Sequence, residues 1–133
     1  MSDLRQAGLI ATIPVGDLVQ ARVFYEEILG FAHIATSEAG ALLQAGGGRI
    51  LLYHSAAPAP AHTLAGFEVG SLEPVMASLK ARGVRFEDYD FPGLTTVDQI
   101  AWIGPERAAW FRDSEGNILS VSEPWRASGG AVG

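Results

Sequence analysis

The sequence contains an internal repeat, and this repeat constrains the fold more than any other feature. Val15-Gly-Asp-Leu18 in the first half matches Val69-Gly-Ser-Leu72 in the second half, with an offset of 54 residues from Val15 to Val69. Phe31 follows the first predicted helix as Val84 follows the second, at an offset of 53. A unit repeated at this spacing indicates a duplicated supersecondary module more strongly than either copy does alone.

The first copy is predicted to be a strand, a helix and then three strands. Residues 8–14 are apolar and β-branched, which favours a strand. Asp17 is a typical helix N-cap, apolar residues follow it at helical spacing, and Gly30 stands where a helix ends. Glycines then separate short apolar segments that we predict as strands, at 31–36, 41–45 and 49–54.

The second copy follows a linker, residues 55–61, that is too rich in proline and alanine to enter a sheet. A strand is predicted at 63–69 and a helix from the N-cap Ser71 to Gly83. Apolar segments then predict strands at 84–88, 99–103, 108–112 and 117–122, the last two joined by a tight turn, Asp113–Asn117.

This order predicts an α+β fold made of two tandem βαβββ modules, the second with one additional predicted strand. We expect a single domain over residues 8–124, with module one at 8–54, the linker at 55–61 and module two at 62–124, followed by a flexible tail at 125–133. A βαβββ unit has a helix on one face of its sheet, and the other face must be covered. The modules are therefore expected to form a curved, partly open, barrel-like sheet around a cleft, the default binding site.

Composition excludes several classes of protein. Hydrophobic residues make up 48% of the chain, enough for a packed core, and the formal charge of −6 argues against nucleic-acid binding. No apolar run approaches the ~20 residues of a membrane span. The absence of cysteine excludes disulfides and thiolate catalysis. Together with a start that lacks an apolar signal core, it leads us to expect a cytoplasmic protein.

Several segments resemble one known family, the vicinal oxygen chelate superfamily, also called the glyoxalase/bleomycin-resistance/dioxygenase superfamily. The matching segments are Ile13-Pro-Val-Gly-Asp-Leu18, Phe24-Tyr-Glu-Glu-Ile-Leu-Gly-Phe31, Leu79-Lys-Ala-Arg-Gly-Val84 and Ala109-Trp-Phe-Arg-Asp-Ser-Glu-Gly-Asn-Ile-Leu119. The resemblance covers nearly the whole chain. It implies paired βαβββ modules around a cleft, a homodimer, and in most members a divalent metal.

The resemblance also implies metal-ligand positions on the first and last strands of each module. Counting from the matched motifs places them at Ile10, Leu64 and Ser120, and at either Ile50 or Leu52. Hydrocarbon side chains have no lone pairs, and one hydroxyl is a poor ligand set. We therefore expect no metal and no cofactor, although a shift of one residue would exchange the faces of the sheet. A site rescued by other residues would need two of His33, His54 and His62, with a carboxylate such as Glu68.

The predicted binding residues are aromatic, apolar and weakly polar. Trp and Tyr offer apolar area with one polar group each, although the same aromatic residues could be core, and the loop 89–98 could cover the cleft or pack on the surface. His54, at the end of its strand, is the candidate general base or hydrogen-bonding group. The predicted ligand contacts are Thr12, Ile50, Leu52, Leu64, Tyr89, Phe91, Trp102, Trp110 and Ser120.

These residues lead to three hypotheses. The preferred one is a protein that binds a small organic molecule without a metal, like the family members that sequester antibiotics. The alternative is a metal-independent enzyme that uses His54 for acid–base chemistry. A divalent-metal lyase or dioxygenase is the third, and it requires a different strand register.

Overall fold

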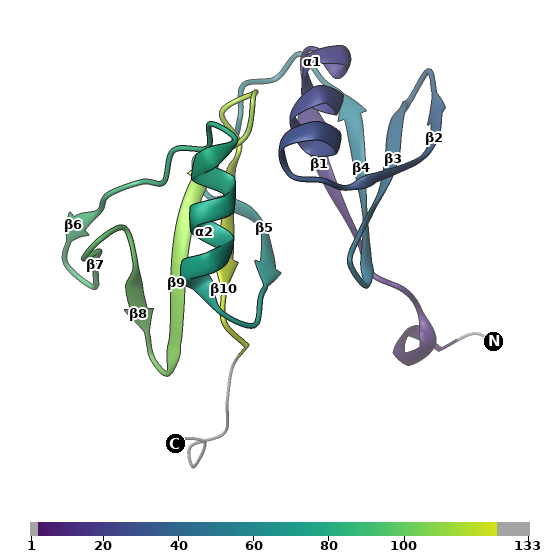
Figure 1. Cartoon of the computed structure of the whole chain (residues 1–133). Coiled ribbons are helices and arrows are strands. Elements are labelled where there is room, and N and C mark those ends of the chain that lie inside the picture. Colours follow the sequence, from purple (N-terminus) through teal and green to yellow (C-terminus); the bar gives the residue numbers. More distant parts are fainter. Residues whose placement is uncertain (1–2, 125–133) are drawn as a thin grey trace. The chain divides into compact units, whose positions relative to one another are not determined.

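A computed structural model of the chain describes residues 3–124, and the predicted tail lies outside the described residues. The described chain forms two compact units that divide in the sequence between Ala59 and Pro60, inside the predicted linker (Figure 1). Each unit contains a four-stranded sheet and a helix, so the predicted α+β class is confirmed. A cleft shared by the two units stays a prediction. None of the helices among residues 3–124 is long and apolar enough to cross a membrane.

Unit one has the predicted order of strand, helix and three strands. It starts with a short 3-10 turn, η1 (Leu4–Gln6). The elements that follow are β1 (Ile10–Val15), α1 (Leu18–Arg22), the π-helical turn η2 (Val23–Ile28), β2 (Ala32–Ser37), β3 (Gly40–Ala45) and β4 (Gly48–His54). The strands lie in the order β1-β4-β3-β2, and β1 is parallel to β4. The last strand thus returns beside the first.

The first helix begins and ends where the sequence predicts. The Asp17 carboxylate accepts a hydrogen bond from the Gln20 backbone N–H at 3.0 Å, and Gly30 has a φ of 86°. Between these points the helix widens, and the Leu29 N–H donates to the Phe24 carbonyl five residues back. The buried Tyr25 lies in this π-helical turn.

The sheet of unit one has a covered face and an open face. Ile13 on β1 pairs with Leu52 on β4, and Leu43 lies on the next strand, β3. All three side chains are fully buried on the side of the sheet that α1 covers. Side chains alternate along a strand, so Thr12 and Leu51 lie on the other side, which we call the open face of unit one.

Unit two repeats the same topology. Its elements are β5, α2, β6, β7, β8, β9 and β10, at Thr63–Glu68, Leu72–Ala81, Asp90–Phe91, Leu94–Thr95, Ala101–Ile103, Glu106–Arg112 and Ile118–Ser122. The strand order β5-β10-β9-β8, with β5 parallel to β10, matches that of unit one (Figure 1). The predicted strand at 84–88 is wrong: this segment makes a single bridge, from Phe86 to Phe111, and β8 takes the edge position.

The start of α2 is held by a carboxylate distant in sequence. Ser71 was predicted to cap this helix, but its side chain makes no capping hydrogen bond to the described residues. Glu123 accepts from the Leu72 N–H instead, at 3.1 Å. Arg107 on β9 donates to Glu123 at 2.9 Å and to Glu73 on α2 at 2.7 Å. This network joins α2 to β9 and to the segment after β10.

The β9–β10 hairpin closes through the predicted turn. One oxygen of the buried Asp113 carboxylate accepts from the backbone N–H groups of Glu115 and Asn117, each at 2.8 Å. The other accepts from the Asn117 side-chain amide at 2.9 Å, and Gly116 has a φ of 87°. The turn sets the register of the strands on either side of it.

We expect Asp113→Ala to destabilise unit two, because three donors lose one shared buried acceptor. The expected loss in free energy of unfolding is about 3 kcal/mol. Urea titration followed by circular dichroism measures it. Glu115→Ala, at a half-buried side chain in the same turn, should cost much less. Equal effects of the two variants would contradict this role of the Asp113 carboxylate.

The ion pair between Glu73 and Arg107 makes stability depend on pH. Hydrogen bonds from Arg107 lower the pKa of Glu73 to about 2, from 4.5. Because the unfolded chain takes up this proton first, the contribution of Glu73 is full above about pH 4.5 and is lost as pH falls toward about 2. Glu73→Gln should therefore be less stable than the parent near pH 7, and the gap should close on acidification. Denaturant unfolding across pH tests this.

Glu27→Gln is the matched control, since Glu27 is exposed and has no ion pair among the described residues. Its stability difference from the parent should stay nearly flat with pH. A Glu73→Gln gap that is constant over the same pH range would contradict the link between this carboxylate and Arg107.

Candidate functional site

The sheet of unit two also has a covered and an open face. Lys80 on α2 lies 5.9 Å from the Phe86 ring, which contacts the Phe111 ring at 5.5 Å, so Phe111 lies on the side of α2. Its neighbour on β9, Trp110, points to the other side. Trp110 pairs with Ser120 on β10, and paired residues share a face. We call this side the open face of unit two.

An aromatic cluster lies on this open face. The Tyr89 ring meets the Trp110 ring edge-to-face at 5.6 Å and the Phe91 ring at 5.7 Å. Tyr89 and Trp110 are half-buried, whereas Phe91 is 52% exposed. The Tyr89 N–H donates to the Thr96 hydroxyl at 2.9 Å, which fixes the segment that carries Tyr89 and Phe91. The structure thus brings together three of the predicted aromatic residues, Tyr89, Phe91 and Trp110.

Polar groups lie beside the cluster. Burial and the nearby Glu87 carboxylate raise the pKa of the Tyr89 phenol, and Arg112 lowers it by less. The phenol therefore keeps its proton and stays a hydrogen-bond donor at neutral pH. Glu87 and Arg112 form an ion pair at 3.5 Å. These groups can orient a polar substituent on a molecule that contacts the rings.

Ser120 occupies space that Gly66 leaves vacant. The two residues are partners across the parallel pair β5–β10, and a Cβ atom added at Gly66 would lie 2.8 Å from the Ser120 hydroxyl oxygen. The hydroxyl therefore lies over the glycine and next to Trp110. Gly66 was not predicted from the sequence, and its role follows from its position opposite the predicted residue Ser120.

Trp102 does not join the aromatic cluster. It pairs with Arg107, which reaches Glu73 on α2, so Trp102 lies on the α2 side of the sheet and is 67% exposed. The prediction that treated Trp102 and Trp110 as walls of one cleft is therefore corrected: their side chains leave opposite faces of the same sheet.

In unit one the predicted register of β4 differs from the structure by one residue. Ile50 and Leu52 are 2% and 0% exposed, on the face covered by α1, so their assignment to the binding face is wrong. Leu51 and Tyr53 lie on the open face instead, and Leu51 pairs with Thr12, which keeps its predicted place. Neither Leu51 nor Tyr53 was predicted from the sequence as a residue of the binding face.

The same correction applies to His54. It pairs with the buried Val15, so its side chain leaves β4 on the α1 side, where it is exposed. The prediction that grouped His54 with the binding face carried the same one-residue shift. His54 is therefore not brought to the face that carries Thr12.

The corrected pairing fixes the metal-ligand position that the sequence left open. On β5, Gly66 lies two residues after Leu64 and pairs with Ser120. On β1, Thr12 lies two residues after Ile10 and pairs with Leu51. The unit-one position that corresponds to Ser120 is therefore Leu51. Leu64 itself is half-buried and lies at a shift in the β5–β10 register.

These residues do not fit a divalent ion. The positions implied by the family carry three hydrocarbon side chains and one hydroxyl, at Ile10, Leu51, Leu64 and Ser120. Such an ion needs several oxygen or nitrogen donors within ~2.0–2.6 Å. Among residues 3–124, no group of three or more His, Asp or Glu side chains is placed to hold a metal.

Comparisons with known proteins agree with this fold. A putative glyoxalase family protein from Bacillus anthracis has a TM-score of 0.70 at 18% identity, over 94% of this chain and 100% of that one. A glyoxalase/bleomycin resistance protein/dioxygenase from Alicyclobacillus acidocaldarius gives 0.69 at 18% identity, over 95% and 96%. TnmS3, an antibiotic binding protein from Streptomyces sp. CB03234, gives 0.64 at 21% identity, over 94% and 99%.

No curated protein matches the sequence significantly. The family model described as the Glyoxalase/Bleomycin resistance protein/Dioxygenase superfamily matches residues 9–121, nearly the whole repeat. The chain therefore belongs to the glyoxalase/bleomycin resistance protein/dioxygenase superfamily.

Proposed function

We propose that this protein binds a small, flat organic molecule on the open face of unit two, without a divalent metal. The observation that carries the proposal is the aromatic cluster of Tyr89, Phe91 and Trp110 beside the Ser120 hydroxyl. The antibiotic-binding neighbour with the same fold supports this type of ligand.

The chemistry of the cluster favours an aromatic ligand. Edge-to-face contacts leave part of each ring free, and a ligand ring that completes the stack gains about 0.5–1.5 kcal/mol per aromatic pair beyond its buried area. The Tyr89 phenol, the Trp110 indole N–H and the Ser120 hydroxyl offer polar contacts around the rings. Phe91, the most exposed of the three rings, can turn over a bound molecule.

The donor set supports binding without a metal. At the family's ligand positions only Ser120 has an oxygen, so affinity must come from apolar and hydrogen-bonding contacts. The metal-independent enzyme remains the alternative hypothesis, but its proposed base, His54, lies on the α1 side of β4. The homodimer stays a prediction.

The expected outcome of a binding experiment is specific to Trp110. We expect 8-anilinonaphthalene-1-sulfonate, a fluorescent aromatic probe, to bind and to shift the Trp110 indole N–H resonance. Trp110→Leu should weaken binding about tenfold, because it removes one large stacking surface. Fluorescence titration gives the affinity, and addition of EDTA should leave it unchanged.

Two control variants lie on the other faces of the sheets. Trp102→Leu and His54→Ala should both keep the affinity of the parent protein. A loss with Trp102→Leu but not with Trp110→Leu would move the site to the α2 side. Loss of binding in EDTA would contradict the metal-free proposal.

A further inference from the structure

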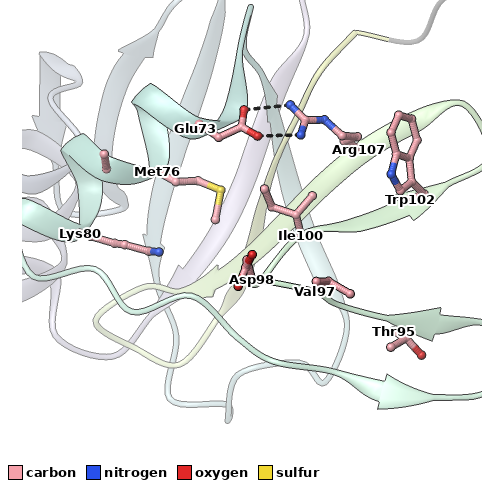
Figure 2. Close-up of a pocket in the computed structure, with 10 residues that line it drawn as sticks. Glu73, Met76, Lys80, Thr95, Val97, Asp98, Ile100, Trp102 and Arg107 are labelled. Atoms are coloured by element: carbon pink, nitrogen blue, oxygen red, sulfur yellow. Dashed lines mark hydrogen bonds and ion pairs between the residues drawn. The ribbon is translucent and has the colours of Figure 1, made fainter.

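A hollow lies on the α2 side of unit two, on the face of the sheet opposite the aromatic cluster. It has a volume of about 570 Å³ and lies between α2 and the segment that runs from β7 to β8, with Arg107 at its edge (Figure 2). This size is within the range of small-molecule sites, which is roughly 300–1,000 Å³. We call it the α2 hollow. It is separated from the aromatic cluster by the sheet itself.

Most of the charge at one end of the hollow is already paired. Arg107 forms two hydrogen bonds with Glu73, drawn in Figure 2, and two more with Glu123. These contacts use the guanidinium in a bidentate manner with each carboxylate, which leaves it little capacity for a ligand. This end is therefore a structural ion-pair network.

The other end presents one cation and one anion. The Lys80 ammonium contacts the Phe86 ring at 5.9 Å but has no hydrogen bond or ion pair with any residue in 3–124. The Asp98 carboxylate likewise has no such partner within that range. Figure 2 shows both side chains directed into the hollow, Lys80 from α2 and Asp98 from the loop before β8. A ligand can pair with both charges.

The chain turns tightly at Asp98 and Gln99. Asp98 and Gln99 have φ angles of 53° and 68° and form a two-residue turn between Val97 and Ile100, which exchange backbone hydrogen bonds of 2.8 and 3.1 Å. Asn, Asp or Gly normally occupies the first of these positions and Gly the second, so Gln99 is the unusual residue. Non-glycine residues held in this conformation concentrate at functional sites.

Apolar surface connects the two ends. Met76 from α2 and Ile100 from the opposite wall lie between the charged pair and Trp102, whose indole is 67% exposed (Figure 2). A large exposed aromatic side chain on the rim of a hollow is typical of a contact surface. The hollow thus combines two unpaired charges of opposite sign with an aromatic wall.

We propose that the α2 hollow binds a small zwitterion with an aromatic side group, such as a free aromatic amino acid. The ligand carboxylate pairs with Lys80, its ammonium pairs with Asp98, and its ring contacts Met76 and Trp102. A simple anion would also face Asp98, and a simple cation would also face Lys80, so each gains less than a molecule carrying both charges.

Three matched probes test the charge requirement. L-Phenylalanine carries both groups, phenethylamine carries only the ammonium, and 3-phenylpropionate carries only the carboxylate. We expect L-phenylalanine to bind about tenfold more tightly than either of the others, since it forms both charge-assisted contacts. Titrations follow the Trp102 indole resonance and a ¹³C-methyl label on Lys80, the only lysine in the chain.

Two variants each remove one of the two proposed charge contacts of the ligand. Lys80→Met should lower the affinity for L-phenylalanine about tenfold and leave that for phenethylamine no weaker. Asp98→Asn should lower the affinity for L-phenylalanine similarly and leave that for 3-phenylpropionate no weaker. Arg85→Gln and Asp88→Asn remove exposed charges that do not line the hollow, and both should bind like the parent protein.

Other results would overturn the proposal. Equal affinities for the three probes, or unchanged binding in Lys80→Met and Asp98→Asn, would contradict the pairing of the ligand charges with Lys80 and Asp98. Shifts at Trp110 in place of Trp102 would place the probe on the open face of unit two. The test of the proposed function with 8-anilinonaphthalene-1-sulfonate can fail independently, because it depends on Trp110 and not on Trp102. A Trp102 resonance that moves with protein concentration alone would assign the hollow to a second copy of the chain.

Discussion

Each unit depends on the return of its last strand to lie parallel beside its first. β4 pairs with β1 and β10 with β5, so the first and last strands of each unit lie side by side in the sheet that its helix covers. Because side chains alternate along a strand, covering one face decides the role of every residue on these paired strands. Ile13 and Leu52 become core for the same reason that Thr12 and Leu51 remain on the open face.

The sequence predicted those features that depend on local chemistry. The Asp17 cap and the Asp113–Asn117 turn are each encoded within a few residues, and the repeat is encoded by short matching motifs in the two halves; all are present. Ser71 has the right chemistry for a cap, but a carboxylate from the far end of the unit takes that position. No local pattern could show this, since Glu123 is 51 residues away from Leu72. The strand predicted at 84–88 was displaced in the same way, by an edge strand that follows it in the chain.

The main wrong prediction assigned Ile50 and Leu52 on β4 to the binding face, and its cause can be named. Residues 50–53 are apolar at every position, so alternation gives no signal. Arg49 was the available clue, because a charged side chain favours the uncovered face and shares it with Leu51 and Tyr53. Trp102 posed a different problem. Its face is set by the Gly104-Pro105 turn, which places it opposite Arg107, and a turn one residue longer would have exchanged the faces.

β9 shows how one strand can serve two kinds of chemistry. Its odd-numbered residues face α2, where Arg107 ties the helix to the sheet and Phe111 fills the core. Its even-numbered residues face the other way, where Trp110 meets Tyr89 and Ser120. Because the family's chelating positions carry mainly hydrocarbon side chains, the proposed recognition on the open face of unit two depends on rings and hydroxyls. The helix that covers the opposite face supplies Lys80 and Met76, and with them a separate, charged hollow. Alternation along one strand therefore keeps the aromatic surface and the charged surface apart, so each can change without changing the other.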